Sequence, residues 1–269
     1  MTPTRAVALA TGAVGTLVVL GAPPAAAAET ATVSVLHAVP ATPVDVYANG
    51  QELIPDFQPG TLTDPLELPA GSYDLAIYPA GSDPASTEPA AKADDVTVPA
   101  GANATVVAHL DEGGAPVITP FVNDTSPVPA GQARVVVRHT AAAPAVDVRA
   151  GGTPVVQGLT NPNEAALTVP AGTVSADVVL AGTDTVAIGP ADLDLAEGAT
   201  TIVYAWGSQD AGFQLAVQTL SGMSSSPSGM PAGTGGLAGD DLPLPLAGVA
   251  LAGLAAAVVA GRRLVPARG

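Results

Sequence analysis

Two histidine–aspartate pairs with the same spacing are the residues of this sequence best placed to do chemistry. His37 is followed eight residues later by Asp45, and His139 is followed eight residues later by Asp147. An imidazole and a carboxylate on neighbouring strands could form part of a metal site, or a general base with the group that orients it. Two ligands are too few for tight metal binding, and no Ser, Glu or second His recurs with the pairs. A structural role is therefore favoured, in which each His caps a strand and each Asp binds a neighbouring turn.

The other polar clusters are weaker candidates. His109 has no counterpart in the other half of the chain, where Tyr204 or Ala205 stands at its place. Calcium could bind neighbouring acids, which occur as Asp94-Asp95, as Asp111-Glu112 and at Asp192 with Asp194. None follows the order Asp-x-Asp-x-Asp-Gly of a dedicated calcium loop. Gly-x-Ser-x-Gly, His-Glu-x-x-His and dinucleotide-binding fingerprints are missing from the sequence as well. We predict no catalytic residue, metal or cofactor.

The only tryptophan, Trp206, lies beside a predicted loop in the segment Tyr204-Ala205-Trp206-Gly207. An exposed aromatic ring at this place could bind a carbohydrate or a protein. A buried ring would instead seal one end of a core made of small side chains. The sealing role is the favoured interpretation.

The elements that would position these residues occur twice, about 100 residues apart. Three blocks recur in the same order: Val33-Ser-Val-Leu-His37 with Val44-Asp45-Val46-Tyr47, then Leu68-Pro69-Ala70-Gly71, then Asp95 to Val98 followed by Thr105-Val-Val-Ala108. Their counterparts are Val135-Val-Val-Arg-His139 with Val146-Asp147-Val148-Arg149, then Val169-Pro170-Ala171-Gly172, then Asp192 to Leu195 followed by Thr201-Ile-Val-Tyr204. Chance similarity does not explain three blocks in one order, so we predict a duplicated domain.

Each copy has the pattern of short strands separated by tight turns. The β-prone runs of the first copy lie at 44–47, 73–78, 96–98, 105–110 and 117–121. Pro-Ala-Gly recurs at 69–71, 99–101, 129–131 and 170–172, as expected for a proline entering a turn whose glycine has a positive φ. Asn49-Gly50 and Gly151-Gly152 predict two-residue hairpins. Seven or so strands in about 90 residues predict one immunoglobulin-like β-sandwich per copy. The first copy would span residues 29–126 and the second copy 127–220, with a linker at 122–129.

The composition agrees with such domains and excludes several functions. Hydrophobic residues make up 48% of the chain but aromatic residues only 3%, so the cores must consist mainly of Ala and Val. Cysteine is absent, which excludes disulfides, thiol catalysis and thiolate metal sites. Between residues 29 and 241, 24 acidic residues face four basic ones, a net formal charge of −20. A surface this negative repels nucleic acid and anionic lipid, so we expect neither as a partner.

The N-terminal segment 1–28 has the pattern of a secretory signal peptide. Arg5 supplies the positive charge and residues 6–20 the apolar stretch. Small residues at Ala26 and Ala28 fit an A-x-A cleavage site, which would leave Glu29 as the first mature residue.

The C-terminal segment predicts a membrane anchor. Residues 242–261 begin with a long uncharged apolar run, and Arg262 and Arg263 follow at once. About 19 residues are enough to cross a hydrocarbon core of roughly 30 Å, and the arginines would keep the tail, 262–269, in the cytoplasm. The Ser/Gly/Pro-rich segment 221–241 is expected to form a flexible stalk. An Ala-rich tail helix packed on the domains is the alternative.

Two resemblances fit this organisation. The segment Met230-Pro-Ala-Gly-Thr-Gly235, followed by an apolar helix and Arg-Arg, resembles the wall-sorting signals that sortases cleave, with Met in place of Leu and one extra residue between Pro and Thr. The His/V-D-V/hairpin/L-x-L-P-A-G-x-Y pattern resembles the bacterial domain-of-unknown-function family numbered 4397, over most of residues 31–220. In the second copy Arg149 stands at the Tyr47 position and Val174 at the Tyr73 position. The resemblance implies extracytoplasmic all-β domains, often in tandem, with no assigned activity.

These observations predict a non-enzymatic surface protein that displays two β-sandwiches as a spacer, adhesive or binding module. It would be a single-pass protein of the cell membrane with an extracellular ectodomain, or a cell-wall protein. The expected partners are the membrane, through the C-terminal helix, and a cell-wall polymer or an extracellular protein. The alternative is a surface hydrolase or metal-dependent binder that uses the two His/Asp pairs.

Overall fold

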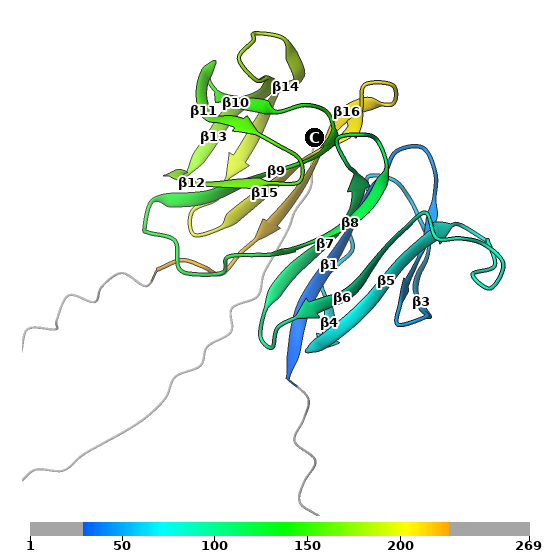
Figure 1. The fold of residues 1–269 in the computed structure, drawn as a ribbon. Coiled ribbons are helices and arrows are strands. Elements are labelled where there is room, and N and C mark those ends of the chain that lie inside the picture. The colour runs from blue at the N-terminus through cyan, green and yellow to red at the C-terminus, as the bar shows by residue number, and fades with distance from the viewer. Residues whose placement is uncertain (1–28, 226–269) are drawn as a thin grey trace, which may run out of the picture. The chain divides into compact units, whose positions relative to one another are not determined.

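The computed structural model of the chain describes residues 29–225, and all of its regular structure is β-sheet (Figure 1). The predicted signal peptide, the stalk after residue 225, the apolar C-terminal segment and the basic tail lie outside the described residues. Within 29–225, no helix is long and apolar enough to span a membrane.

Sixteen strands form four sheets of four strands each. The first eight are β1 (Thr30–Ala38), β2 (Val44–Ala48), β3 (Gln51–Phe57), β4 (Leu66–Pro69), β5 (Gly71–Pro79), β6 (Ala91–Val98), β7 (Asn103–Leu110) and β8 (Pro116–Val122). The second eight are β9 (Gln132–Ala142), β10 (Val146–Ala150), β11 (Thr153–Leu159), β12 (Glu164–Pro170), β13 (Gly172–Leu180), β14 (Val186–Leu195), β15 (Thr200–Ser208) and β16 (Gly212–Leu220).

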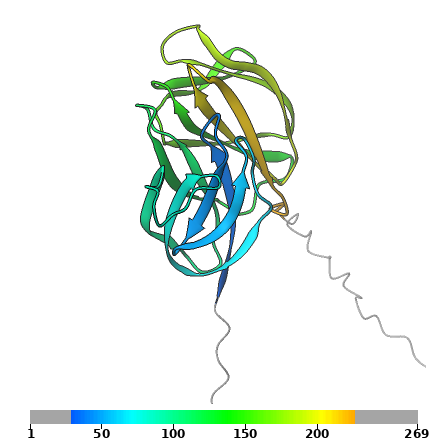
Figure 2. The same cartoon turned by 90° about the vertical axis from the view of Figure 1, so that its right-hand side faces the viewer.

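The strand order repeats between the two halves, as the duplicated sequence blocks predict. The first copy has sheets β4-β1-β7-β8 and β3-β2-β5-β6, and the second has β12-β9-β15-β16 and β11-β10-β13-β14. In each copy the two sheets lie in layers and enclose a core of their own (Figures 1 and 2). The all-β, two-sheet architecture is therefore the one expected from the sequence.

The strand order, which the sequence left open, differs from that of a constant-type immunoglobulin domain. The constant-type immunoglobulin order places the first two strands in one sheet of a seven-stranded sandwich. Here each copy has eight strands, its first and second strands lie in different sheets, and its first strand pairs in parallel with its seventh. Turn chemistry and alternation locate strands along the chain, but they do not fix which strands become neighbours.

The two predicted hairpins are confirmed. Asn49 and Gly50 join β2 to β3 with φ values of 51° and 74°, and Gly151 and Gly152 join β10 to β11 with 56° and 79°. Two successive positive φ angles are what a two-residue turn between twisted strands requires. The Pro-Ala-Gly turns agree only in part, because Gly101 and Gly131 have positive φ and Gly71 does not.

The third repeated block has to be realigned by one residue. In the strand pairing, His37 lies beside Ala108 and His139 lies beside Ala205. The position in the second copy that is equivalent to Thr105 is therefore Ile202 and not Thr201. A shift of one residue in a strand moves every side chain to the other face of the sheet. The similarity between Thr105-Val-Val and Thr201-Ile-Val is thus a coincidence, because these residues do not occupy equivalent positions in the two copies.

The central strands of each copy are buried on both faces. Alternate residues of β1 and β9, such as Val33 and Val135, point into the core of their own copy. The intervening residues, such as Leu36 and Val136, join a second core that lies between the copies. The complete buried set of this shared core is Leu36, Ala38, Val107, Phe121, Val136, Ile202, Tyr204 and Trp206. A strand with no solvent-facing side reads as a continuous apolar run, which explains the Val-Val-Val and Thr-Val-Val-Ala segments.

The linker between the copies is held in place at its far end. Val128 is buried, its amide donates to the carbonyl of Met223, and the amide of Ser225 donates to the carbonyl of Val128. The predicted stalk therefore begins later than residue 221, because residues 223–225 still pair with the linker.

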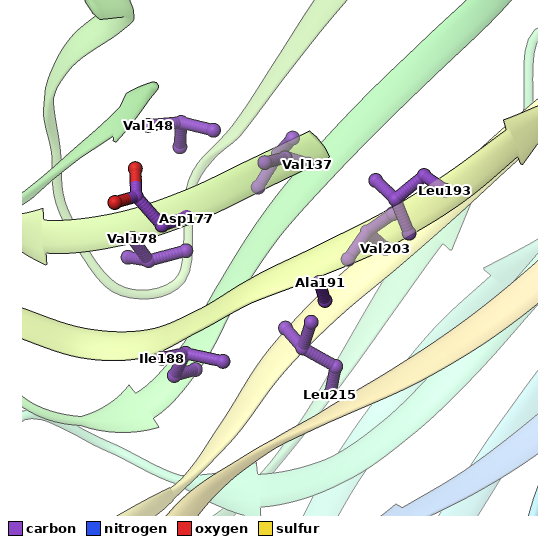
Figure 3. Close-up of a pocket in the computed structure, with 10 residues that line it drawn as sticks. Val137, Val148, Asp177, Val178, Ile188, Ala191, Leu193, Val203 and Leu215 are labelled. Atoms are coloured by element: carbon purple, nitrogen blue, oxygen red, sulfur yellow. The ribbon is translucent and has the colours of Figure 1, made fainter. Parts of the chain in front are cut away.

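The core of the second copy is less well filled than that of the first. An apolar cavity of about 130 Å³ lies between its sheets, whereas the matching cavity in the first copy measures about 30 Å³. Tyr73 and Leu75 line the small cavity, and Val174 and Ala176 occupy their register positions in the second copy. A neighbouring gap of about 30 Å³ is lined by aliphatic residues, and Asp177 is the only charged residue that lines it (Figure 3).

Filling the larger cavity should stabilise the protein. Ala176→Leu introduces the residue of the first copy, and at about 24 cal/mol per Å³ of cavity we expect a gain of about 1–2 kcal/mol in the free energy of unfolding. Urea unfolding measures the gain. The reciprocal change Leu75→Ala should cost about 2–5 kcal/mol. An unchanged or lower unfolding midpoint for Ala176→Leu would show that the cavity is not accessible to a larger side chain.

Candidate functional site

Each histidine of the two predicted pairs holds the loop that follows its own strand. The Nε2 atom of His37 lies 2.9 Å from the carbonyl oxygen of Thr42, and its Nδ1 atom accepts a hydrogen bond from the amide of Val39 at 3.4 Å. His139 repeats this arrangement with the carbonyl of Pro144 at 3.0 Å and the amide of Ala141 at 3.4 Å. Both rings are buried. A neutral imidazole with its proton on Nε2 satisfies both contacts, so each ring is fully used by the backbone.

Each aspartate of the pairs binds two loops at once. Asp45 accepts hydrogen bonds from the amide of Asp56 through Oδ1 and from the amide of Gly81 through Oδ2, both at 2.8 Å. Asp147 binds the amides of Gly158 at 2.7 Å and Gly182 at 2.9 Å in the same way. The hydrogen bonds from Gly182 and Gly158 lower the pKa of the Asp147 carboxyl. The carboxylates therefore connect the end of β3, or β11, to the turn after β5, or β13.

The structure does not bring the members of either pair together as a dyad. Within residues 29–225, neither histidine forms a hydrogen bond with its aspartate, and no group of three His, Cys, Asp or Glu side chains could hold a metal ion. The spacing of eight residues recurs because both copies use the same two loop contacts.

The third histidine faces the shared core. His109 is buried, with Nδ1 2.8 Å from the carbonyl oxygen of Leu110 and Nε2 2.8 Å from the hydroxyl of Thr119. Burial lowers the pKa of His37, His109 and His139, against the opposing effect of their hydrogen bonds to backbone carbonyls. All three rings are thus kept neutral by their surroundings.

A closed ring of hydrogen bonds crosses the boundary between the copies. Arg138 of β9 is only 1% exposed, and it donates to the Tyr204 hydroxyl and to Oδ1 of Asn123, both at 2.8 Å. Asn123 donates to the hydroxyl of Thr105 at 3.1 Å. Thr105 and Tyr204 both donate to Oε1 of Gln218, at 2.9 and 2.6 Å. Asn123 and Thr105 belong to the first copy and the other three residues to the second, so the ring fixes the copies to each other.

The charge of Arg138 is compensated on several sides. Its Nε atom lies 2.7 Å from the carboxylate of Glu164, and its guanidinium carbon lies 4.4 Å from the ring centre of Phe121. Aromatic faces attract a guanidinium, most strongly where water is excluded. Burial raises the pKa of Tyr204, which keeps its hydroxyl protonated and able to donate. Sequence reasoning missed this site, although the replacement of Leu36 by Arg138 between otherwise matching strands was a signal for it.

Trp206 is buried in the same boundary and not exposed. Its side chain is 3% exposed, and its indole nitrogen has no hydrogen-bond partner within the described residues. A Cβ atom at Gly60 of the first copy would lie 3.1 Å from the indole ring, so the β3–β4 connection packs directly on it. The ring therefore seals the boundary between two cores, and its use as an exposed binding residue is ruled out.

The outer face of sheet β3-β2-β5-β6 carries an open groove of about 200 Å³. Tyr47 and Tyr78 form its aromatic wall, with ring centres 5.2 Å apart and the planes at 78°. Pro84 and Pro89 of the β5–β6 connection line the groove as well. In the second copy Arg149 takes the place of Tyr47 and forms an ion pair with Asp177. The groove thus belongs to the first copy alone.

Residues 31–149 match the family model described as Domain of unknown function (DUF4397). The match agrees with the resemblance to this family that the sequence pattern indicates, and it covers less than half of the chain. The match begins in β1, covers the rest of the first copy and ends in β10 of the second. The matched segment therefore contains the groove lined by Tyr47 and Tyr78, both His/Asp pairs, and three of the five residues of the hydrogen-bonded ring.

Comparisons with individual proteins add little to the DUF4397 match. No curated protein sequence matches the chain. Among solved structures, the Bacillus anthracis TIE protein is 11% identical, with 69% of this chain and 34% of that chain covered and a TM-score of 0.23. A proposed cell adhesion protein from Bacteroides uniformis is 12% identical, with 71% and 98% covered and a TM-score of 0.19. This chain spans about a third of the TIE protein, and at such scores neither structure informs its function.

The buried histidines make stability depend on pH. Below their ordinary pKa of 6.5 the unfolded chain takes up protons that the folded chain resists. The free energy of unfolding should therefore fall as the pH falls from about 7.5 to about 5. His37→Gln with His139→Gln keeps a donor near each loop carbonyl but removes the titration, so this variant should show a shallower profile in urea unfolding. Equal slopes for both proteins would mean that these histidines titrate alike in the folded and unfolded chain.

Loss of the buried guanidinium should weaken the boundary between the copies. Arg138→Leu, which introduces the residue found at Leu36, leaves Oδ1 of Asn123 without its donor and removes the hydrogen bond that the Tyr204 hydroxyl accepts. We expect a loss of about 2–4 kcal/mol in the free energy of unfolding, measured in urea. The matched control is Glu164→Gln, which removes a half-exposed charge but keeps an acceptor and should cost less than about 1 kcal/mol. Equal losses for the two variants would contradict the role assigned to the ring.

Proposed function

We propose that the protein is a non-enzymatic bacterial surface protein that displays its two β-sandwiches as a spacer, adhesive or binding module. One observation carries this proposal. In both copies the His and Asp side chains that are the best candidates for catalysis or metal binding use their ring nitrogens and carboxylate oxygens to hold loops. A base or metal ligand needs a free lone pair directed at a substrate or ion. The side chains therefore serve the display of a rigid surface.

The joined copies suit a role as a presenting unit. The shared core and the ring through Arg138 leave little freedom for the sandwiches to move separately. Rigid elements present a binding surface at low entropic cost. The outer sheets, β3-β2-β5-β6 and β11-β10-β13-β14, are then free to contact other molecules.

The proposed place of display is the outer side of the cell membrane. It rests on the sequence pattern of a signal peptide at 1–28, an apolar helix at 242–261 and the basic tail at 262–269. The membrane is the first partner, through that helix. A cell-wall polymer or an extracellular protein is the second, and the sortase-like segment at 230–235 would make the wall an alternative point of attachment.

Fractionation of cells that produce the full chain tests this location. We expect the protein in the membrane or wall fraction, and its β domains should be lost when intact cells are treated with an external protease. A variant that lacks residues 242–269 should appear in the medium, because only the anchor is removed. Retention of both proteins in the cytoplasm would refute surface display.

Metal titration tests the alternative, a hydrolase or metal-dependent binder built on the His/Asp pairs. Calcium or zinc should leave the melting temperature of the full chain nearly unchanged, since a ligand that binds the folded state must raise it. A rise of several degrees that disappears in His37→Gln with Asp45→Asn would favour the alternative.

A further inference from the structure

We propose that the groove between Tyr47 and Tyr78 is a saccharide-binding site that takes one neutral sugar unit of a larger glycan. This inference deepens the proposed function, because it gives the binding module a ligand class. It rests on the comparison of one surface in the two copies of a single domain.

The two copies differ most clearly at this surface. Tyr47 lies on β2 and Tyr78 lies on the adjacent strand β5, and Arg149 and Val179 occupy the same register positions in the second copy. Arg149 donates from Nε to Asp177 at 2.9 Å, and Val179 is 1% exposed. The fold therefore does not need two tyrosines at these positions. The second copy folds without an aromatic pair at these positions, so a role in the fold does not explain the half-exposed tyrosines of the first copy.

The shape and chemistry of the groove favour a sugar ring. Edge-to-face tyrosines give one wall an apolar face and leave hydroxyl groups at its border, and amphipathic rings of this kind suit ligands with apolar and polar faces. Tyr47 donates to Glu52 at 3.3 Å, which holds the ring in place. Asp74 uses one carboxylate oxygen for the amide of Asp95, so its second oxygen can accept from a hydroxyl group. An apolar wall beside a few polar groups is typical of small-ligand sites.

The charges at the border select a neutral ligand. Asp74, Lys92 and Asp94 line the groove, and the ammonium group of Lys92 lies 3.1 Å from the carboxylate of Asp94. One basic and two acidic groups leave the border negative, within a domain region that is itself strongly acidic. Phosphate- or carboxylate-bearing sugars would be repelled. A proline-rich peptide is the other ligand type that docks on tyrosines and prolines. Its proline residues have no N–H or O–H group to donate to the carboxylates of the groove.

Calorimetric titration of the full chain tests the site, in a detergent without a sugar head group. The probes are chitobiose, maltose and lactose as neutral saccharides, polygalacturonate as an anionic one, and a decaproline peptide. We expect at least one neutral saccharide to bind and polygalacturonate and decaproline not to bind. Tyr47→Arg with Tyr78→Val, the residues of the second copy, should weaken that binding at least tenfold. Tyr47→Phe should keep most of it, because the ring face remains.

The control is Val217→Ser, at a 49% exposed position of β16 in the second copy, which should bind as the unchanged protein does. Trp206 fluorescence and the melting temperature show that each variant is folded. Absence of binding by all three neutral saccharides would overturn the proposal, and so would preference for decaproline or equal binding by the Tyr47→Arg, Tyr78→Val variant. Because the purified protein is used, such a failure leaves surface display intact, whereas a cytoplasmic location would refute display and leave the groove's chemistry untouched.

Discussion

A buried guanidinium has to find hydrogen-bond acceptors and compensating charge within the protein, and the joining of the two copies depends on how this chain meets that need. Arg138 is removed from water at the centre of the boundary. Glu164 and Tyr204 of its own copy supply part of its surroundings, and Asn123 and Phe121 of the other copy supply the rest. Separation of the copies would expose an apolar core and would also break up these contacts. A cost of this kind favours one arrangement over the alternatives more than it adds net stability.

The boundary also explains why the copies have diverged. With Arg138 in place of Leu36 and Tyr204 in place of Val107, the second copy matches only the first, whose Asn123 and Thr105 complete the ring. Polar groups that are satisfied by one partner and left unpaired by another are a common source of specificity. The inner sheets supply all the residues of the shared core, and the outer sheets, β3-β2-β5-β6 and β11-β10-β13-β14, supply none.

The sequence predicted those features that depend on local chemistry. The hairpins at Asn49-Gly50 and Gly151-Gly152 depend on the turn residues themselves and not on distant strands. The repeated blocks identify a duplication without any knowledge of strand order. The loop contacts of His37 and Asp45 are of the structural kind that the sequence favoured. Neighbouring strands, in contrast, are chosen by long-range packing, so the strand order could not be predicted and the alignment of Thr105 with Thr201 was wrong. The shared core was missed because a strand buried on both faces has the same apolar letters as any buried strand. Arg138 was overlooked for that reason, since its burial depends on the surface of the other copy, whereas the favoured burial of Trp206 is confirmed.

The central claim is that the two sandwiches fold and unfold as one unit held together by their shared core. Urea unfolding of the full chain, followed at once by the emission of Trp206 and by far-ultraviolet circular dichroism, tests it most directly. Trp206 reports on the boundary, and the dichroism reports on the strands of both copies. If the copies form one cooperative unit, both signals should change in a single transition with the same midpoint. A tryptophan transition that precedes the main loss of strand structure, or two separate steps in the dichroism, would show that the sandwiches are independent and would contradict this account.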